Sequence, residues 1–178
     1  RVTTGVEDVF GHTMSSQYQT TNGFVVCSDP DNVTFVAVGY VLSNSVYSGR
    51  LYTSFNGTTC WISRNIGSTD FLESGTYANS TFVVVGGSTE SSTSGAILSS
   101  TDGKSWTSRS LGWGTGDASD IWEVTYGGGK FMAVGNGDGV SITSSNNGTT
   151  WNTNARIDLT YGVYSVGYGN NVFVSTNV

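Results

Sequence analysis

The sequence predicts an all-β protein that is built from a repeated unit of four short antiparallel strands. One marker of the repeat is an apolar segment of the type Phe-Val-x-Val-Gly, whose first residue recurs at Phe35, Phe82, Phe131 and, in a shortened copy, Phe173. A second marker is a tryptophan that follows each complete copy: Trp61, Trp106 and Trp151. Half of the chain is Gly, Ser, Thr or Asn, yet aromatic residues make up 12% of it. A disordered linker lacks such apolar surface, so this composition indicates a folded protein rich in turns.

Each strand of the unit has its own place in the repeat. The predicted first strands precede the phenylalanine: Phe24–Ser28, Phe71–Ser74, Ile121–Tyr126 and Val163–Tyr168. The second strand is the Phe-Val-x-Val segment, an apolar run typical of a strand that is buried on both faces. The predicted third strands end in serine: Arg50–Ser54, Ala96–Ser100 and Val140–Ser144. An Asn-Gly or Asp-Gly turn, whose residues accept positive φ, then leads into a fourth strand that the tryptophan opens.

A repeat of four strands in roughly 40–50 residues is the signature of a β-propeller blade. Such blades must stack, because a single sheet cannot bury both of its faces. We expect about 3.5–4 four-stranded antiparallel blades in this chain. The expected units are an N-terminal segment 1–22, three blades at 23–66, 67–111 and 112–158, and a half blade at 159–178. Two arrangements stay open. In the first, strands from residues 1–22 complete a four-bladed ring. In the second, another chain or further blades complete a larger ring, and the abrupt termini favour this arrangement.

The second turn reads Ser-Thr-Asp102-Gly103-Lys-Ser-Trp, and it resembles the Asp-box hairpin of sialidases and related propellers. The residue that usually separates Asp from Gly in that motif is absent here. In the flanking copies we expect Asn56 and Asn147 to replace the aspartate, because asparagine also bonds to its own turn. The resemblance implies a BNR-like, sialidase-type propeller architecture without the catalytic set, in which Asp102 and Gly103 hold the hairpin and do not touch a ligand.

Charge and composition exclude several classes of function. The net charge is −6 with only seven Lys and Arg residues, whereas binding to a phosphate backbone needs clustered cations. We therefore expect no nucleic-acid partner. No apolar run approaches the roughly 20 residues of a membrane-spanning helix, so no membrane insertion is expected. His12 is the single histidine, which excludes a multi-histidine metal site, and we expect no metal and no other cofactor.

The leading functional interpretation is a non-enzymatic structural or binding module of an extracellular, cell-surface or virion protein, which meets a partner through the loop face of the propeller. The alternative is a lectin-like propeller that binds carbohydrate. The third is a sialidase-like glycoside hydrolase, which would need two carboxylates about 5–9.5 Å apart. One arginine follows the tryptophan of each repeat, at Arg64, Arg109 and Arg156. Such a periodicity is typical of packing or edge protection rather than of a single active site.

The candidate ligand-binding residues are Trp113, Asp117, Asp120 and Tyr40. Sites on propellers lie where first strands begin and where second strands connect to third, so the predicted loops 40–47 and 111–120 belong to this face. Trp113 lies between glycines at a position that the repeat does not explain. An exposed tryptophan beside two carboxylates suits stacking on a sugar ring and hydrogen bonds to its hydroxyls. The alternative is that Trp113 folds back over the end of the blade.

The two cysteines, Cys27 and Cys60, are expected to be unpaired, buried thiols. Cys27 belongs to a predicted first strand and Cys60 borders a predicted fourth strand. Three strand spacings amount to roughly 14 Å, and this exceeds the roughly 4.4–6.8 Å Cα separation of a disulfide.

Overall fold

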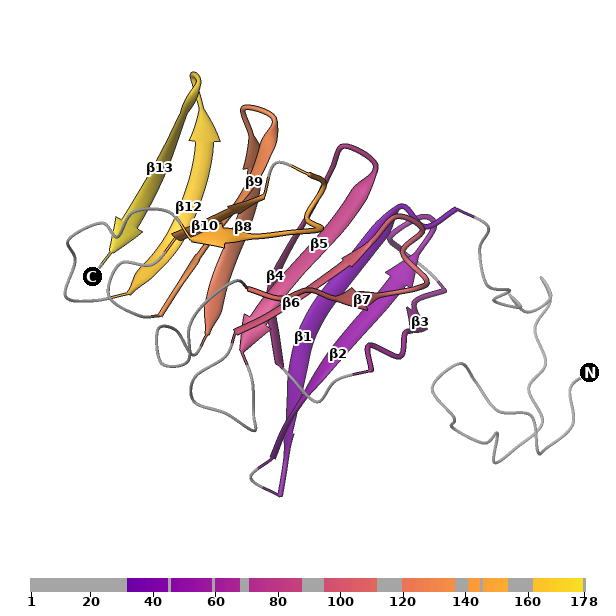
Figure 1. The fold of residues 1–178 in the computed structure, drawn as a ribbon. Helices are drawn as coiled ribbons and strands as arrows, with labels where there is room; N and C mark the ends of the chain where they lie inside the picture. Colours follow the sequence, from indigo (N-terminus) through magenta and orange to yellow (C-terminus); the bar gives the residue numbers. More distant parts are fainter. Residues whose placement is uncertain are drawn as a thin grey trace, which may run out of the picture.

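The computed structural model of the protein consists of β-strands and their connections over the residues that it describes (Figure 1). Those residues are 32–44, 46–58, 60–67, 71–87, 95–111, 120–136, 141–144, 146–153 and 162–177. The segment 1–22 and the predicted strand Phe24–Ser28 lie outside them. Within the described part of the chain the predicted all-β fold is confirmed, as antiparallel sheets of two to four strands without a helix.

Four sheets follow one another along the chain. The first contains β1 (Phe35–Ser43), β2 (Val46–Ser54) and β3 (Ile62–Ser63). The second contains β4 (Phe71–Ala78), β5 (Thr81–Gly87), β6 (Gly95–Ser100) and β7 (Thr107–Ser108). The third contains β8 (Ile121–Gly127), β9 (Lys130–Gly135), β10 (Ser141–Ser144) and β11 (Asn152–Thr153), and the fourth contains β12 (Val163–Gly169) and β13 (Val172–Asn177). Each strand pairs with the next strand of its sheet, so every sheet is a meander.

The strands lie close to the positions that the repeat predicts. Strands β4, β8 and β12 begin at the expected residues, and each short fourth strand begins directly after its tryptophan. The turns between first and second strands contain residues at positive φ, among them Asn79 at 48° and Asn170 at 50°. Asparagine tolerates this conformation, which a two-residue hairpin turn requires.

One predicted loop is wrong. Residues 40–43 and 46–47 continue β1 and β2, which stay paired as far as Ser43 and Val46. The segment carries the apolar residues Val41 and Leu42, which favour an extended strand over a polar loop. Asn44, at a φ of 49°, then makes the tight turn between the two strands.

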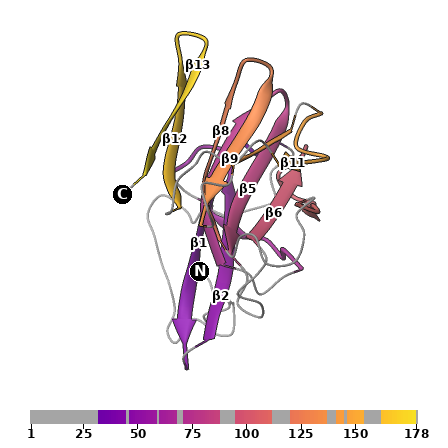
Figure 2. The ribbon, with the colours of Figure 1, turned by 60° about the vertical axis from the view of Figure 1, so that its left-hand side comes forward.

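The sheets pack face to face, each against the next one along the chain (Figure 2). Successive side chains of β5 alternate between two interfaces, as the pleat of a strand requires. Val84 packs in one cluster with Leu51 of the first sheet, whereas Val83 packs in another with Phe131 of the third sheet. The interior sheets are therefore apolar on both faces, which explains the unbroken Phe-Val-x-Val pattern.

The turn between β6 and β7, which contains Asp102, is held by its own polar groups. The Ser100 hydroxyl donates to Asp102 Oδ1 at 2.9 Å, and the Gly103 N–H donates to Ser100 Oγ at 2.8 Å. The N–H groups of Lys104 and Ser105 each donate to Asp102 Oδ1 at 2.8 Å. The carboxylate thus binds two backbone donors of the tight turn, which stabilises the hairpin between β6 and β7.

In the third repeat Asn146 takes the place of the aspartate, so the expectation for Asn147 is wrong. The Ser144 hydroxyl donates to Asn146 Oδ1 at 2.9 Å, and the Thr150 N–H donates to the same oxygen at 3.0 Å. This turn reads Ser-Ser-Asn-Asn-Gly and is one residue longer than the second turn. The additional residue, Asn147, adopts a φ of 58°, and its Oδ1 accepts a hydrogen bond from Asn79 Nδ2 of the second sheet.

The backbone N–H of Ser105, with further donors of the turn, lowers the pKa of Asp102 from 3.8 to about 2. Because the folded pKa lies below the unfolded one, the stabilisation is complete above pH 3.8 and is lost as the pH falls toward 2. We expect the Tm of the wild type to fall more steeply than that of Asp102→Asn when thermal unfolding is followed downward from about pH 5. The asparagine keeps an acceptor oxygen but does not titrate, so parallel Tm curves would contradict the prediction.

Cys60 forms a disulfide, so the expected unpaired thiol at this position is wrong, and the described residues contain no free cysteine. Cys60 lies in the turn before β3 at a φ of 57°. The expected separation of roughly 14 Å assumed that Cys60 lies beside the paired strands of the sheet. It does not apply to a residue that lies in a turn. Cys27 lies outside the described residues.

Candidate functional site

The first strands of three successive sheets each contain a bulge at the same position of the repeat. The pairing register shifts by one residue between Leu72 and Ser74, between Ile121 and Glu123, and between Val163 and Ser165. The residues left unpaired in the ladders are Glu73, Trp122 and Tyr164. Each lies nine residues before the phenylalanine of its repeat. Bulges re-aim side chains and are frequent next to functional sites.

A glycine at the end of the second strand accommodates two of these bulges, those of β4 and β8, whereas the bulge of β12 lies opposite Thr176 and Asn177. A Cβ on Gly86 would lie 1.8 Å from the carbonyl oxygen of Phe71, and one on Gly135 would lie 2.0 Å from the carbonyl oxygen of Asp120. No other residue allows the second strand to approach the bulged first strand this closely. The two glycines therefore allow the close approach of the strands at the bulges of β4 and β8.

Trp122 and Tyr164 stack on each other across the third and fourth sheets. Their ring centroids are 4.1 Å apart and the ring planes differ by 18°. Tyr164 remains 50% exposed, so this pair presents an aromatic surface to solvent. Gly162 lies against the indole, and a Cβ there would come within 2.8 Å of the ring. The absence of a side chain at this position leaves room for the tryptophan.

Two carboxylates lie at the start of the first strands of the second and third sheets, and Asp120 precedes Trp122 by two residues. Glu73 is the bulge residue of β4, and Asp120 directly precedes β8 and forms a bridge with Gly87. Burial raises the pKa of Glu73, and the negative charge of Asp120 raises it further. Burial also raises the pKa of Asp120. The two acids therefore form an interacting pair, in which Glu73 is exposed and Asp120 is half-buried.

A second aromatic cluster adjoins the carboxylates on the side of the first sheet. The ring centroids of Tyr40 and Tyr47 are 5.3 Å apart, and each lies 5.8 Å from that of Phe71. Phe71 and Asp120 both pack on Gly87, because a Cβ there would lie 2.2 Å from Phe71 Cζ and 2.1 Å from Asp120 Oδ1. We call the whole set the bulged edge; it consists of Tyr40, Tyr47, Phe71, Glu73, Asp120, Trp122 and Tyr164.

The structure places two of the four predicted site residues at the bulged edge. Tyr40 belongs to the aromatic cluster and Asp120 to the carboxylate pair. Trp113 and Asp117 lie outside the described residues. These site residues were predicted in loops, whereas the described part of the edge is built from strand residues and from residues that adjoin them.

Five residues of the edge escaped the sequence analysis: Tyr47, Phe71, Glu73, Trp122 and Tyr164. A signal for three of them was present, because Glu73, Trp122 and Tyr164 align when the repeats are superposed on their phenylalanines. This position differs in every copy, although the flanking pattern recurs. A variable position in a regular repeat indicates a role outside the packing of the sheets.

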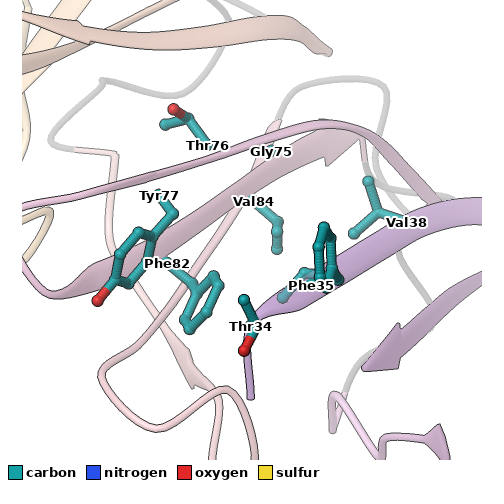
Figure 3. A pocket seen from close by; sticks show the side chains of 9 residues that line it. Thr34, Phe35, Val38, Gly75, Thr76, Tyr77, Phe82 and Val84 are labelled. Atoms are coloured by element: carbon teal, nitrogen blue, oxygen red, sulfur yellow. The ribbon is translucent and has the colours of Figure 1, made fainter. Parts of the chain in front are cut away.

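A cavity of about 250 Å³ opens between β1 and the hairpin of β4 and β5 (Figure 3). Phe35 and Val38 line it from the first sheet, and Phe82 and Val84 line it from the second. The residues that the structure places around this cavity carry no charge. Its volume also lies below the roughly 300–1,000 Å³ of ligand pockets. The bulged edge is therefore the stronger candidate for recognition of a polar ligand.

A polar cavity of about 350 Å³ lies beside the turns of the second and third sheets. Arg109 is its charged donor, and its Nε donates to Ser99 Oγ at 2.7 Å. Arg64 repeats this bond in the first sheet, where its Nε donates to Thr53 Oγ1 at 2.7 Å. The two arginines tie the end of each sheet to its third strand. Arg156 lies outside the described residues.

Glu73→Gln is expected to raise the Tm at neutral pH. The folded state holds the carboxylate at a raised pKa, so ionisation lowers the free energy of unfolding as the pH rises above the unfolded value of 4.5. The gain should vanish in acid, where the wild-type carboxyl is protonated in both states. In the control Glu123→Gln no gain is expected, because Glu123 Oε2 accepts a hydrogen bond from the Val166 N–H at 3.2 Å. A Tm difference for Glu73→Gln that is independent of pH would refute this reading.

The described residues contain no group of three or more His, Cys, Asp or Glu side chains that could hold a metal ion. In the same part of the chain no helix is long and apolar enough to cross a membrane. No protein-family model matches the chain, and no curated protein matches it either. The arrangement of the bulged edge is therefore the observation from which function must be argued.

Proposed function

We propose that this protein is a non-enzymatic binding module whose sheets are blades of a β-propeller, and that its bulged edge binds a carbohydrate. One observation carries the proposal: the bulges of successive first strands carry the stacked pair of Trp122 and Tyr164 and the carboxylate of Glu73, which interacts with Asp120. Aromatic faces pack against the C–H faces of sugar rings, and carboxylate oxygens accept hydrogen bonds from sugar hydroxyls. An apolar surface with a few oriented polar groups is the usual composition of a ligand site.

The propeller arrangement is supported by the order and packing of the sheets. They follow one another along the chain, each packs against the next, and the two most complete ones are four-stranded meanders. This is the pattern of blades laid around an axis. The bulged edge lies where the first strands begin, on the face that the sequence analysis assigned to ligands.

The proposed location is outside the cytoplasm, in a secreted, cell-surface or virion protein. The disulfide at Cys60 supports it, because disulfides form and persist in oxidising environments. The surface rich in hydroxyls and amides also suits a display element, and charged residues make up only 11% of the chain.

Glycoside hydrolysis is the second candidate, and the carboxylate pair is the observation that favours it. A glycosidase needs one carboxyl group with a raised pKa as general acid and a second carboxylate as base or nucleophile. Glu73 and Asp120 interact, and the pKa of each is raised. A binding module leaves the glycan intact, whereas a hydrolase cleaves it, so one experiment can distinguish the two candidates.

A glycan array probed with the full chain, followed by calorimetric titration of the best glycan, tests the proposal. We expect saturable binding and an intact glycan recovered from the titration cell. A cleaved glycan would replace the binding module by the hydrolase. The absence of saturable binding to every glycan on the array would refute both candidates.

A further inference from the structure

The interfaces between successive sheets use the same positions of the repeat. On the second strand, the residue after the phenylalanine packs toward the next sheet: Val36, Val83 and Met132. The second residue after the phenylalanine packs toward the preceding sheet. At this position Val84 shares a cluster with Leu51 of the first sheet, and Ala133 shares one with Val83 of the second. The chain therefore builds the same type of interface twice, and in the third interface the fourth sheet contributes Val163, Val166 and Phe173 instead.

The fourth sheet presents one half of this interface to solvent. Val174 occupies the repeat position of Val83, yet Val174 is 64% exposed and Val83 is 0% exposed. Gly169 occupies the position of Gly127. A Cβ on Gly127 would lie 2.0 Å from the ring of Tyr168, whereas nothing lies within 4 Å of a Cβ on Gly169. Among the described strands β13 pairs with β12 alone, while β5 and β9 pair on both edges.

The first sheet presents the other half of the interface. Ala37 is exposed, whereas Val84 and Ala133 at the same repeat position are 1% and 0% exposed. Tyr52 on β2 is half-buried, whereas Leu98 at the same position of the second sheet is 2% exposed. The outer face of the first sheet therefore carries the same repeat positions that the second and third sheets use to pack against the preceding sheet.

We infer that a second copy of this chain docks head to tail, so that the outer face of its first sheet covers the Val174 face of the fourth sheet. The two end faces are opposite halves of an interface that the chain already forms within itself. A second copy therefore supplies a sheet with the matching repeat positions. Contacts of this kind are heterologous, and they close into a ring or continue as a filament.

Sedimentation velocity of the full chain over a wide range of concentration tests the inference. The wild type should form species heavier than the single 18.7 kDa chain. Val174→Glu blocks one end face and Ala37→Glu blocks the other, so neither variant should assemble alone. An equimolar mixture of the two should give a heterodimer, because each variant keeps the face that the other has lost. Leu42→Glu is the matched control; Leu42 is 56% exposed at the tip of the first hairpin, and its variant should assemble as the wild type does.

Two results would overturn the inference. A wild type that stays at the mass of one chain at every concentration would show that no second copy docks. Hydrogen exchange of β13 would then report whether another segment of the same chain covers this strand. Single variants that still assemble alone would show that the contact is not head to tail. Melting curves of the variants at the wild-type Tm exclude unfolding as the cause of a lost assembly.

Discussion

Tyr164→Ala is expected to weaken glycan binding by roughly thirtyfold or more, which corresponds to about 2 kcal/mol for the loss of an aromatic hot spot. The ring is 50% exposed and stacks on Trp122 at a centroid distance of 4.1 Å. Its removal takes away half of the aromatic surface on which a sugar ring would pack. Titration of the glycan selected on the array, with wild type and variant at equal concentration, measures the change.

Tyr77→Ala is the matched control for this result. Tyr77 is 58% exposed and packs on Phe82 at a centroid distance of 4.4 Å, but it lies at the opposite end of β4 from the bulge. The same chemical change at similar exposure should leave glycan affinity unaltered. Equal losses in both variants would show that the effect is not local to the bulged edge, and the proposed site would have to be abandoned.

Phe131→Ala is expected to cost about 3–5 kcal/mol of unfolding free energy, the usual range for a fully buried phenylalanine. Phe131 is 0% exposed and lies in the cluster between the second and third sheets, where its ring adjoins those of Tyr126 and Trp151. Removal of the ring leaves a cavity that stacked sheets cannot close without shifting their registers. The Tm should fall by about 10 °C, given roughly 2–4 °C per kcal/mol for a domain of this size.

Phe35→Ala provides the comparison within the repeat. Phe35 occupies the same position of its repeat as Phe131 but is 46% exposed, so its truncation should cost less than half as much. Denaturant unfolding of both variants measures the two differences directly. Equal costs would contradict the dependence of the loss on burial.

The periodic part of the fold could be predicted from the sequence. A strand of Phe-Val-x-Val type, a turn of Asn-Gly or Asp-Gly and a short strand after a tryptophan depend on a few neighbouring residues. Local preferences therefore predicted their positions well. The errors arose where a single residue changed the local geometry: Asn147 is the additional residue of a longer turn, and Cys60 lies in a turn at positive φ.

The candidate site could be predicted only in part. Asp120 and Tyr40 were recognised as polar or aromatic residues near a strand end. Glu73 and Trp122 were missed, because each was assigned to a regular strand, in which alternate side chains belong to the core. A bulge at their position re-aims these side chains, and the bulge arises from contact with Gly86 and Gly135 of the neighbouring strands.

The sequence by itself determined that the chain forms antiparallel sheets with apolar second strands and tight turns, because strand pattern and turn chemistry act over a few residues. Only the tertiary structure decided which side chains meet along the bulged edge. It also decided which repeat positions stay exposed at the two ends of the stack. Both depend on the register between strands and on the presence of a neighbouring sheet, which are properties of residues far apart in the chain.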